Sequence, residues 1–218
     1  MNFSYAIFDL DGTLLDSMTY WRNNIALFAV KEKGYSVSKQ TEEKTYGMYA
    51  DKAMALLRCE LNITEEIPFS PNYREAVLRP TYENIIEPKP HAIEFLRLLK
   101  AKGIKMCLAT ATDRDLFMPA VKKHGMEEFF EFMITTSEVG KSKASSDIYD
   151  IALERLGGTK ENTVVFEDAP YCINTASKAG YRIFAIDDDY SRYDRENTEK
   201  LCERYITDYG MFIKEILN

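Results

Sequence analysis

The chain has 218 residues, 45% hydrophobic and 29% charged, as expected for a soluble globular protein of one or two domains. Its formal net charge of −7 argues against sequence-independent binding of nucleic acid, which requires a basic surface. An anionic substrate would therefore have to be attracted by local positive charge or by a metal ion.

The cysteines and the hydropathy pattern indicate a cytoplasmic protein. Cys59, Cys107, Cys172 and Cys202 are widely spaced and form no CxxC pair, so we expect free thiols in a reducing compartment. No segment approaches the roughly 18 apolar residues that span a bilayer, and the apolar start at residues 3–8 lacks the basic flank of a signal peptide. We expect a monomer without a membrane partner.

The first part of the chain combines one strand with a helical region. The apolar run Tyr5–Phe8 indicates a buried parallel strand. Apolar residues then recur with helical spacing, and Pro80 is expected to kink or divide the last of the helices. The helical patterns cover residues 19–33, 51–61 and 72–85.

Strands and helices alternate after the stretch Glu87–Pro90. The predicted strands lie at residues 104–109, 132–135, 163–166 and 181–186, with helical patterns between them and at the end of the chain. This alternation predicts an α/β fold, a Rossmann-like doubly wound parallel sheet formed by residues 1–16 and 88–218. The inserted all-helical cap domain, residues 17–87, is expected over the carboxyl ends of the strands, where such sheets bind ligands.

Two carboxylates directly follow the first predicted strand. Asp9 and Asp11 are two residues apart, so in extended chain their side chains project to the same side. Their mutual repulsion is relieved by a divalent cation or by a shared proton, and Gly12 allows the backbone to approach a ligand. Carboxylate oxygens suit Mg²⁺, which also accepts water and phosphate oxygens as ligands.

The segment from Asp9 to Ser17, DLDGTLLDS, resembles the first motif of the haloacid dehalogenase superfamily. Its phosphatase and beta-phosphoglucomutase-like branch, which has a helical cap directly after this motif, is the most similar. The resemblance implies that Asp9 attacks phosphorus to form an aspartyl phosphate. It also implies that Asp11 transfers protons and places its backbone carbonyl on the metal. Dehalogenating members carry an aromatic residue at the position of Asp11, which disfavours carbon–halogen chemistry.

The same resemblance assigns the remaining motifs. Thr110 and the backbone at Ala111 would bind phosphoryl oxygens together with Gly12, and Asp168 would bind Mg²⁺, with Glu167 bound directly or through water. The lysine motif departs from the family, because both of its usual prolines are absent from Lys143–Asp147. Lys143 is the expected lysine, and Lys141 is the chemically equivalent alternative.

The resemblance predicts a Mg²⁺-dependent phosphatase that hydrolyses a small phosphomonoester, either a sugar phosphate or a phosphoglycolate-like metabolite. Trp21, Tyr49 and Lys52 of the cap are candidates for substrate selection. Mutases of the beta-phosphoglucomutase type carry an arginine at the position of Ala50, so a sugar phosphomutase is the second hypothesis. The alternative outside the enzymes is a phospho-accepting signalling domain or a non-catalytic binding protein.

Overall fold

The computed structural model describes residues 2–22, 24–45, 48 and 50–217. It contains a six-stranded sheet in the order β3-β2-β1-β4-β5-β6, in which every neighbouring pair is parallel. The expected α/β fold with a doubly wound parallel sheet is therefore confirmed. The strands are β1 Tyr5–Phe8, β2 Lys105–Thr110, β3 Phe132–Thr135, β4 Thr163–Glu167, β5 Arg182–Ile186 and β6 Arg204–Ile206.

The chain divides into two compact units. One is discontinuous and comprises residues 1–16 and 86–218, and the other comprises residues 17–85. Residues 86 and 87 were expected in the helical segment, but they belong to the discontinuous unit. Glu87 is held there because its carbonyl accepts a hydrogen bond from the amide of Asp16 at 3.0 Å, and the Ile86 carbonyl lies 2.9 Å from Nε2 of His124.

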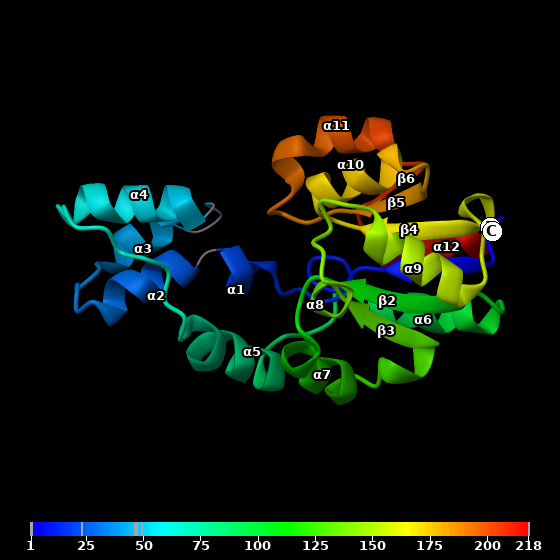
Figure 1. Ribbon diagram of the computed structural model, residues 1–218, viewed down its shortest axis with the longest axis horizontal. Coiled ribbons are helices and arrows are strands. Elements are labelled where there is room, and N and C mark those ends of the chain that lie inside the picture. The colour runs from blue at the N-terminus through cyan, green and yellow to red at the C-terminus, as the bar shows by residue number, and fades with distance from the viewer. Residues whose placement is uncertain (1, 23, 46–47, 49, 218) are drawn as a thin grey trace. The chain divides into compact units, whose positions relative to one another are not determined.

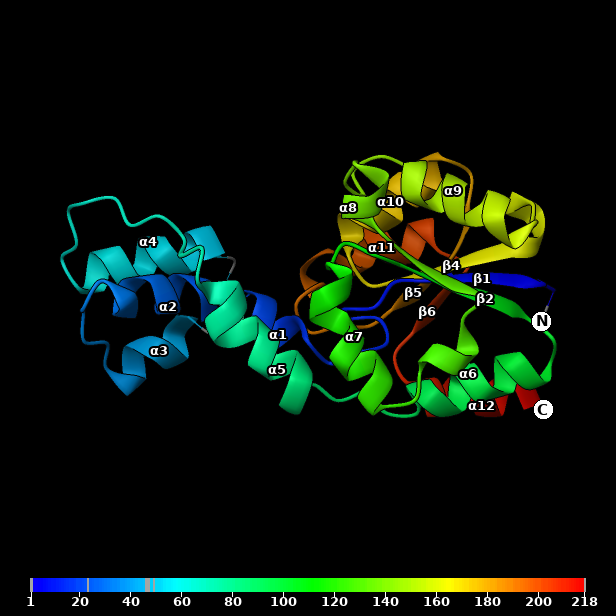
Figure 2. The same cartoon turned by 60° about the horizontal axis from the view of Figure 1, so that its bottom comes forward.

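Helices cover both faces of the sheet in the discontinuous unit (Figure 2). Residues of α9 and α10 pack on one face against the apolar side chains of β1, β2, β4 and β5. The other face carries an aromatic layer in which Phe8 stacks on Phe166 at 4.2 Å between ring centroids and Phe95 stacks on Tyr209 at 5.1 Å. The helices are α6 Ala92–Ala101, α7 Arg114–Lys123, α8 Thr136–Val139, α9 Asp147–Leu156, α10 Pro170–Lys178, α11 Arg195–Leu201 and α12 Tyr209–Leu217.

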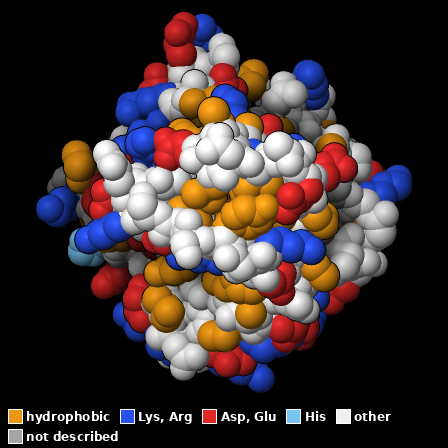
Figure 3. All heavy atoms as spheres, turned by 90° about the vertical axis from the view of Figure 1, so that its left-hand side faces the viewer, with side chains coloured by type: hydrophobic (Ala, Val, Ile, Leu, Met, Phe, Trp, Pro, Cys, Tyr) orange, Lys and Arg blue, Asp and Glu red, His pale blue; other side chains and the backbone are white. Residues whose placement is uncertain are grey.

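The second unit is helical and has its own apolar core, formed largely by α2 and α4 (Figure 1). Ion pairs from Lys31 to Glu42 and from Lys44 to Glu60 connect α3 to both of these helices. On the face shown in Figure 3, acidic and basic side chains are interspersed with small hydrophobic patches. The elements of the helical unit are α1 Met18–Arg22, α2 Asn24–Glu32, α3 Lys39–Thr45, α4 Ala50–Glu60, a π-helical turn Arg74–Leu78 and α5 Arg79–Asn84.

Some elements differ from the sequence-based expectation. Helix α3 was not predicted, because its segment KQTEEKT has no apolar periodicity and buries only Thr41 and Thr45. Pro80 was expected to kink or divide the last helix, and the helix does change there. A π-helical turn ends at Leu78, and Pro80 lies in the first turn of α5, where its missing N–H is tolerated. Residues 204–206 add a sixth strand to the sheet. Among the described residues, no helix has both the length and the apolar character needed to cross a bilayer.

Candidate active site

The carboxyl ends of three neighbouring strands bring the predicted site residues together. Strand β1 lies between β2 and β4, with Phe8 opposite Leu108 on one side and opposite Phe166 on the other. The amide of Asp9 donates to the Phe166 carbonyl at 2.9 Å, so the first residue beyond β1 stays attached to β4. The side chains that follow these strands therefore meet at one edge of the sheet.

Lys143 lies at the centre of this cluster and is 2% exposed. Its ammonium donates to Oδ1 of Asp9 and to Glu167, with Nζ–Oε distances of 3.3 and 3.5 Å. Lys141, in contrast, is exposed and pairs with Asp147 at 2.6 Å. Of the two candidate lysines, Lys143 is the one that contacts the aspartate after β1.

Asp168 completes a group of carboxylates that fits a divalent cation. One oxygen each from Asp9, Glu167 and Asp168 lie within 4.8 Å of one another, and all three side chains are buried. Oδ1 of Asp168 accepts a hydrogen bond from the Thr13 hydroxyl at 3.3 Å, whereas Oδ2 has no hydrogen-bond partner among the described residues. Buried carboxylates of this kind require compensation, and hard oxygen donors are the ligands that Mg²⁺ prefers.

The pKa values in the cluster are shifted by burial, which disfavours every charged form, and by the charges of the neighbouring side chains. Burial and the neighbouring Asp9 carboxylate raise the pKa of Glu167 to about 8, although Lys143 opposes this shift. Burial and the charges of Glu167 and Asp9 also raise the pKa of Asp168 well above its usual range. Burial alone would lower the pKa of Lys143, but Asp9 and Glu167 outweigh it, so the pKa of this ammonium is raised and it stays charged.

Asp11 lies in a tight turn beside the end of β2. Gly12 adopts a φ of 83°, and its amide donates to the Leu15 carbonyl at 2.9 Å, which folds the chain back after Asp11. The Thr112 hydroxyl donates to Oδ2 of Asp11 at 2.6 Å. Thr110, the last residue of β2, is 1% exposed. The loop after β2 thus adjoins the loop after β1.

Several neighbours of the cluster were not among the predicted site residues. Tyr209 of α12 is buried, and its hydroxyl donates to the Thr13 carbonyl at 3.0 Å. The Tyr149 ring lies 5.7 Å from Nζ of Lys143. The Cys172 thiol is buried beside Glu167, and burial raises its pKa, so it is a neutral neighbour rather than a nucleophile. None of these three residues belongs to a motif that the resemblance assigns.

The three predicted specificity residues belong to the helical unit. Trp21 is half-buried and donates its indole N–H to the Tyr82 hydroxyl at 2.8 Å within that unit. Lys52 is exposed on α4, and Tyr49 lies outside the described residues. Their contact with a substrate stays a prediction.

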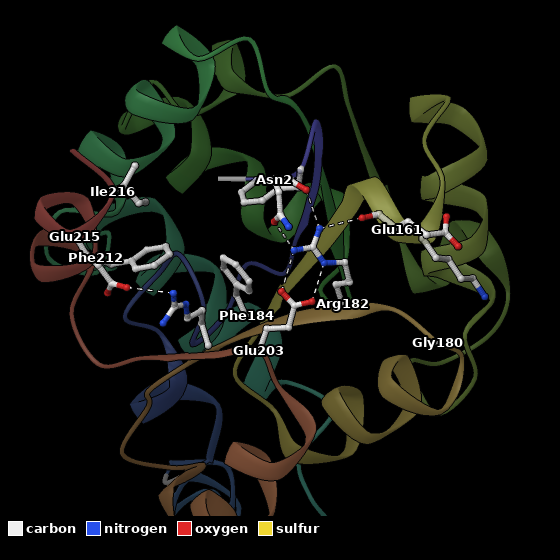
Figure 4. Close-up of a pocket in the computed structure, with 12 residues that line it drawn as sticks. Asn2, Glu161, Gly180, Arg182, Phe184, Glu203, Phe212, Glu215 and Ile216 are labelled. Carbon is white, nitrogen blue, oxygen red and sulfur yellow. Dashed lines mark hydrogen bonds and ion pairs between the residues drawn. The ribbon is translucent and has the colours of Figure 1, made fainter. Parts of the chain in front are cut away.

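A separate pocket of about 750 Å³ lies at the opposite, amino-terminal edge of the sheet (Figure 4). Arg182 points into it and binds Glu203 through two hydrogen bonds of 2.7 and 2.9 Å. The remaining guanidinium N–H groups donate to Asn2 and to the Glu161 carbonyl. All five donors of this guanidinium are therefore used within the protein, which indicates a structural role for Arg182.

The chain thus has an α/β fold with a buried acidic cluster at the carboxyl edge of its parallel sheet. A family model described as haloacid dehalogenase-like hydrolase matches residues 6–186, and the chain belongs to this family. The phosphorylated carbohydrates phosphatase of Thermotoga maritima is 27% identical over 184 residues, which cover 83% of each chain. Pyrophosphatase PpaX of Oceanobacillus iheyensis is 23% identical over 85% of this chain and 84% of that protein.

Solved structures share the fold. CbbY from Rhodobacter sphaeroides, in complex with phosphate, has a TM-score of 0.68 and 21% identity and covers 94% of this chain and 93% of its own. A Thermotoga maritima protein provisionally named a beta-phosphoglucomutase has a TM-score of 0.68 and 23% identity, with 94% of both chains covered. A haloacid dehalogenase-like protein from Agrobacterium tumefaciens reaches a TM-score of 0.71 at 20% identity, covering 99% of this chain and 100% of its own.

Proposed function

We propose that the protein is a Mg²⁺-dependent phosphatase that hydrolyses a small phosphomonoester through a phosphorylated Asp9. The observation that carries this proposal is the contact of Asp9 with the buried Lys143, next to Glu167 and Asp168. Membership in a hydrolase family favours it over a phospho-accepting signalling domain or a non-catalytic binding protein.

In this mechanism the Asp9 carboxylate attacks phosphorus, and the bond from phosphorus to the leaving oxygen breaks. Asp11 donates a proton to that oxygen. It then takes a proton from the water that attacks the acyl phosphate, which releases inorganic phosphate and restores Asp9. Lys143 holds Asp9 and offsets charge on the phosphoryl oxygens, and the hydroxyl of Thr110 with the amides near Ala111 and Gly12 would bind those oxygens.

Asp9, Glu167 and Asp168, with the backbone carbonyl of Asp11, would hold the metal ion, which offsets the repulsion between nucleophile and phosphate when bound. The names of the relatives guide the choice of substrate. One relative is a phosphatase of phosphorylated carbohydrates, another a pyrophosphatase, and a third, from Arabidopsis thaliana, a glycerol-3-phosphatase. We propose sugar phosphates and other phosphorylated metabolites of similar size as the substrate class.

Replacing Asp9 tests the proposal. Asp9→Asn removes the nucleophile but preserves shape, so turnover should fall by several powers of ten, roughly 10⁴-fold or more, while the fold is retained. Phosphate release and the far-ultraviolet circular dichroism spectrum measure these two properties. The nucleophile assignment is wrong if the variant keeps the parent rate.

A substrate panel separates hydrolysis from phosphomutase activity. Inorganic phosphate would be measured after incubation with hexose, pentose and triose phosphates, with and without a hexose 1,6-bisphosphate. A phosphatase releases phosphate from the monophosphates without the bisphosphate. A mutase instead converts a hexose 1-phosphate to the 6-phosphate, and does so faster when the bisphosphate is present.

A further inference from the structure

Thr112 lies beside Asp11 and is not among the predicted site residues. The Thr112 hydroxyl donates to Oδ2 of Asp11 at 2.6 Å, a length typical of a hydrogen bond to a carboxylate. Thr112 is 6% exposed, so this contact is largely shielded from water. Residues 11 and 112 come from the loops after β1 and β2, and this bond connects the two loops.

The hydroxyl that makes this bond is itself firmly placed. The amide of Thr112 donates to Oγ1 of Thr110 at 3.1 Å, and Thr110 is the buried last residue of β2. The carbonyl of Ala111, between them, lies 3.3 Å from the Thr136 hydroxyl, which donates to it. The backbone that carries Thr112 is therefore anchored to the sheet.

The bond also distinguishes the two oxygens of Asp11. When the carboxyl group is protonated, the oxygen that accepts from a hydroxyl remains the carbonyl-type oxygen, and the other oxygen carries the proton. As long as Oδ2 accepts from Thr112, Oδ1 is the oxygen that is available to carry the proton. A fixed carboxyl plane also removes rotational freedom that would otherwise have to be lost in the transition state.

We propose that Thr112 is a positioning residue that orients Asp11 through this hydrogen bond, so that Oδ1 delivers the proton to the leaving oxygen. This proposal rests on the proposed function, in which Asp11 is the general acid. Thr112 then contributes most where the leaving group needs a proton, and little where the leaving group departs readily as an anion.

Two aryl phosphates test this dependence, because they share the phosphoryl group and differ in the leaving group. The ratio kcat/KM would be measured for phenyl phosphate, whose leaving group is poor, and for p-nitrophenyl phosphate, whose leaving group is good. In Thr112→Val, which removes the hydroxyl but keeps the shape, kcat/KM for phenyl phosphate should fall roughly 10- to 100-fold. For p-nitrophenyl phosphate it should fall by less than about threefold.

Two further variants complete the experiment. Thr112→Ser restores the hydroxyl and should stay within about threefold of the parent on both substrates. Asp11→Asn should show the same selective loss as Thr112→Val, with a larger amplitude. Equal losses on both substrates in Thr112→Val, no loss in that variant, or failure of serine to restore activity would each overturn the role of Thr112.

The outcomes also distinguish this inference from the function on which it rests. Should Asp11→Asn discriminate between the two esters while Thr112→Val does not, the general acid stands and only the positioning role fails. The proposed mechanism itself fails if Asp9→Asn retains activity, or if kcat/KM of Asp11→Asn falls equally for both substrates. Thermal unfolding of each variant confirms that the native fold is being compared.

Discussion

Lys143 is the only positive charge in contact with Asp9 and Glu167 among the described residues, and all three side chains are buried. Removing one partner of a buried charge pair costs far more than removing an exposed one, because the remaining charge keeps its desolvation penalty. Replacing Lys143 should therefore lower stability and activity much more than replacing Lys141.

Lys143→Met should lower the free energy of unfolding by about 3–5 kcal/mol in the presence of a chelator, since the carboxylates lose their counter-charge. Phosphate release should fall by roughly 10²- to 10³-fold. Lys141→Met is the matched control, because this lysine pairs with Asp147 in an exposed position, and its loss should cost about 0–1 kcal/mol. Urea unfolding and phosphate release measure both effects, and a larger loss in Lys141→Met would contradict the assignment.

The role of Asp168 as a metal ligand can be tested without an activity assay, by measuring how much Mg²⁺ stabilises the protein. Mg²⁺ at 100 times its Kd should stabilise the parent by about 2.7 kcal/mol. Asp168→Asn removes an anionic ligand and should weaken Mg²⁺ binding by about tenfold or more, which reduces this stabilisation by about 1.3 kcal/mol or more. In chelator the variant should be no less stable than the parent, because its neutral amide relieves carboxylate repulsion.

The control for that measurement is Asp189→Asn, an exposed aspartate that pairs with Arg192. It should keep the parent's full response to Mg²⁺ in thermal unfolding and in titration calorimetry. An unchanged response in Asp168→Asn would show that Asp168 is not a metal ligand.

The charged side chains of the candidate site could be predicted from the sequence. Asp9, Glu167 and Asp168 directly follow apolar strands, and the carboxyl ends of parallel strands meet at one edge, so their proximity was predictable. Tyr209 and Thr112 were not, because a single hydroxyl on a helix or in a loop has no recurring spacing. Their contacts depend on the packing of α12 and on the loop after β2.

The connection between β5 and β6 depends on Asp187, the residue that follows β5. Its amide donates to the Ile206 carbonyl at 2.8 Å, and its carboxylate accepts from Nε of Arg192 at 3.0 Å and from the Tyr205 hydroxyl at 2.7 Å. Burial alone would raise the pKa of Asp187, but these hydrogen bonds and the charge of Arg192 outweigh it and lower the pKa. The folded state therefore favours the charged carboxylate.

Asp187→Asn should consequently lower stability in a pH-dependent manner. Because the pKa is lower in the folded state, the contribution of the carboxylate is complete above the unfolded pKa of about 3.9 and is lost as pH falls through the folded pKa. At pH 7 the variant should be about 1–3 kcal/mol less stable than the parent, and the difference should shrink on acidification below about pH 4. Urea unfolding across this pH range measures it.

Glu196→Gln is the control for Asp187→Asn, because Glu196 is an exposed carboxylate that pairs with Lys200 four residues away. Its effect should stay within about 0.5 kcal/mol at every pH. A difference between Asp187→Asn and the parent that is constant with pH would show that packing, not the carboxylate charge, joins β5 and β6.

The buried strands and most of the helices were predictable, including the charged helix α11, whereas helix α3 and strand β6 were not. The strand Val164–Phe166 is fully apolar and buried, which makes it recognisable without a structure. Helix α3 is polar, and β6 has only three residues, so neither gives a periodic signal. Strand order also escaped prediction, because β1 pairs with β4 across more than 150 residues of intervening chain.

The two units differ in whether one or two stretches of the chain form them. The helical unit is one uninterrupted stretch, residues 17–85, whereas the α/β unit is assembled from two stretches. The residues proposed for bond making and bond breaking all lie in the α/β unit. The proposed substrate-selecting residues of the cap all lie in the helical one.

The two ends of the inserted stretch meet at a single place. The amide of Asp16 binds the Glu87 carbonyl at 3.0 Å, the amide of Lys89 binds the Leu14 carbonyl at 2.8 Å, and Leu15 and Pro88 form an antiparallel bridge. The chain thus leaves and re-enters the α/β unit through neighbouring backbone positions. A change in the length of residues 17–85 should therefore leave the register of β1 against β2 and β4 intact, because the residues on either side of the insertion are joined to each other within the α/β unit.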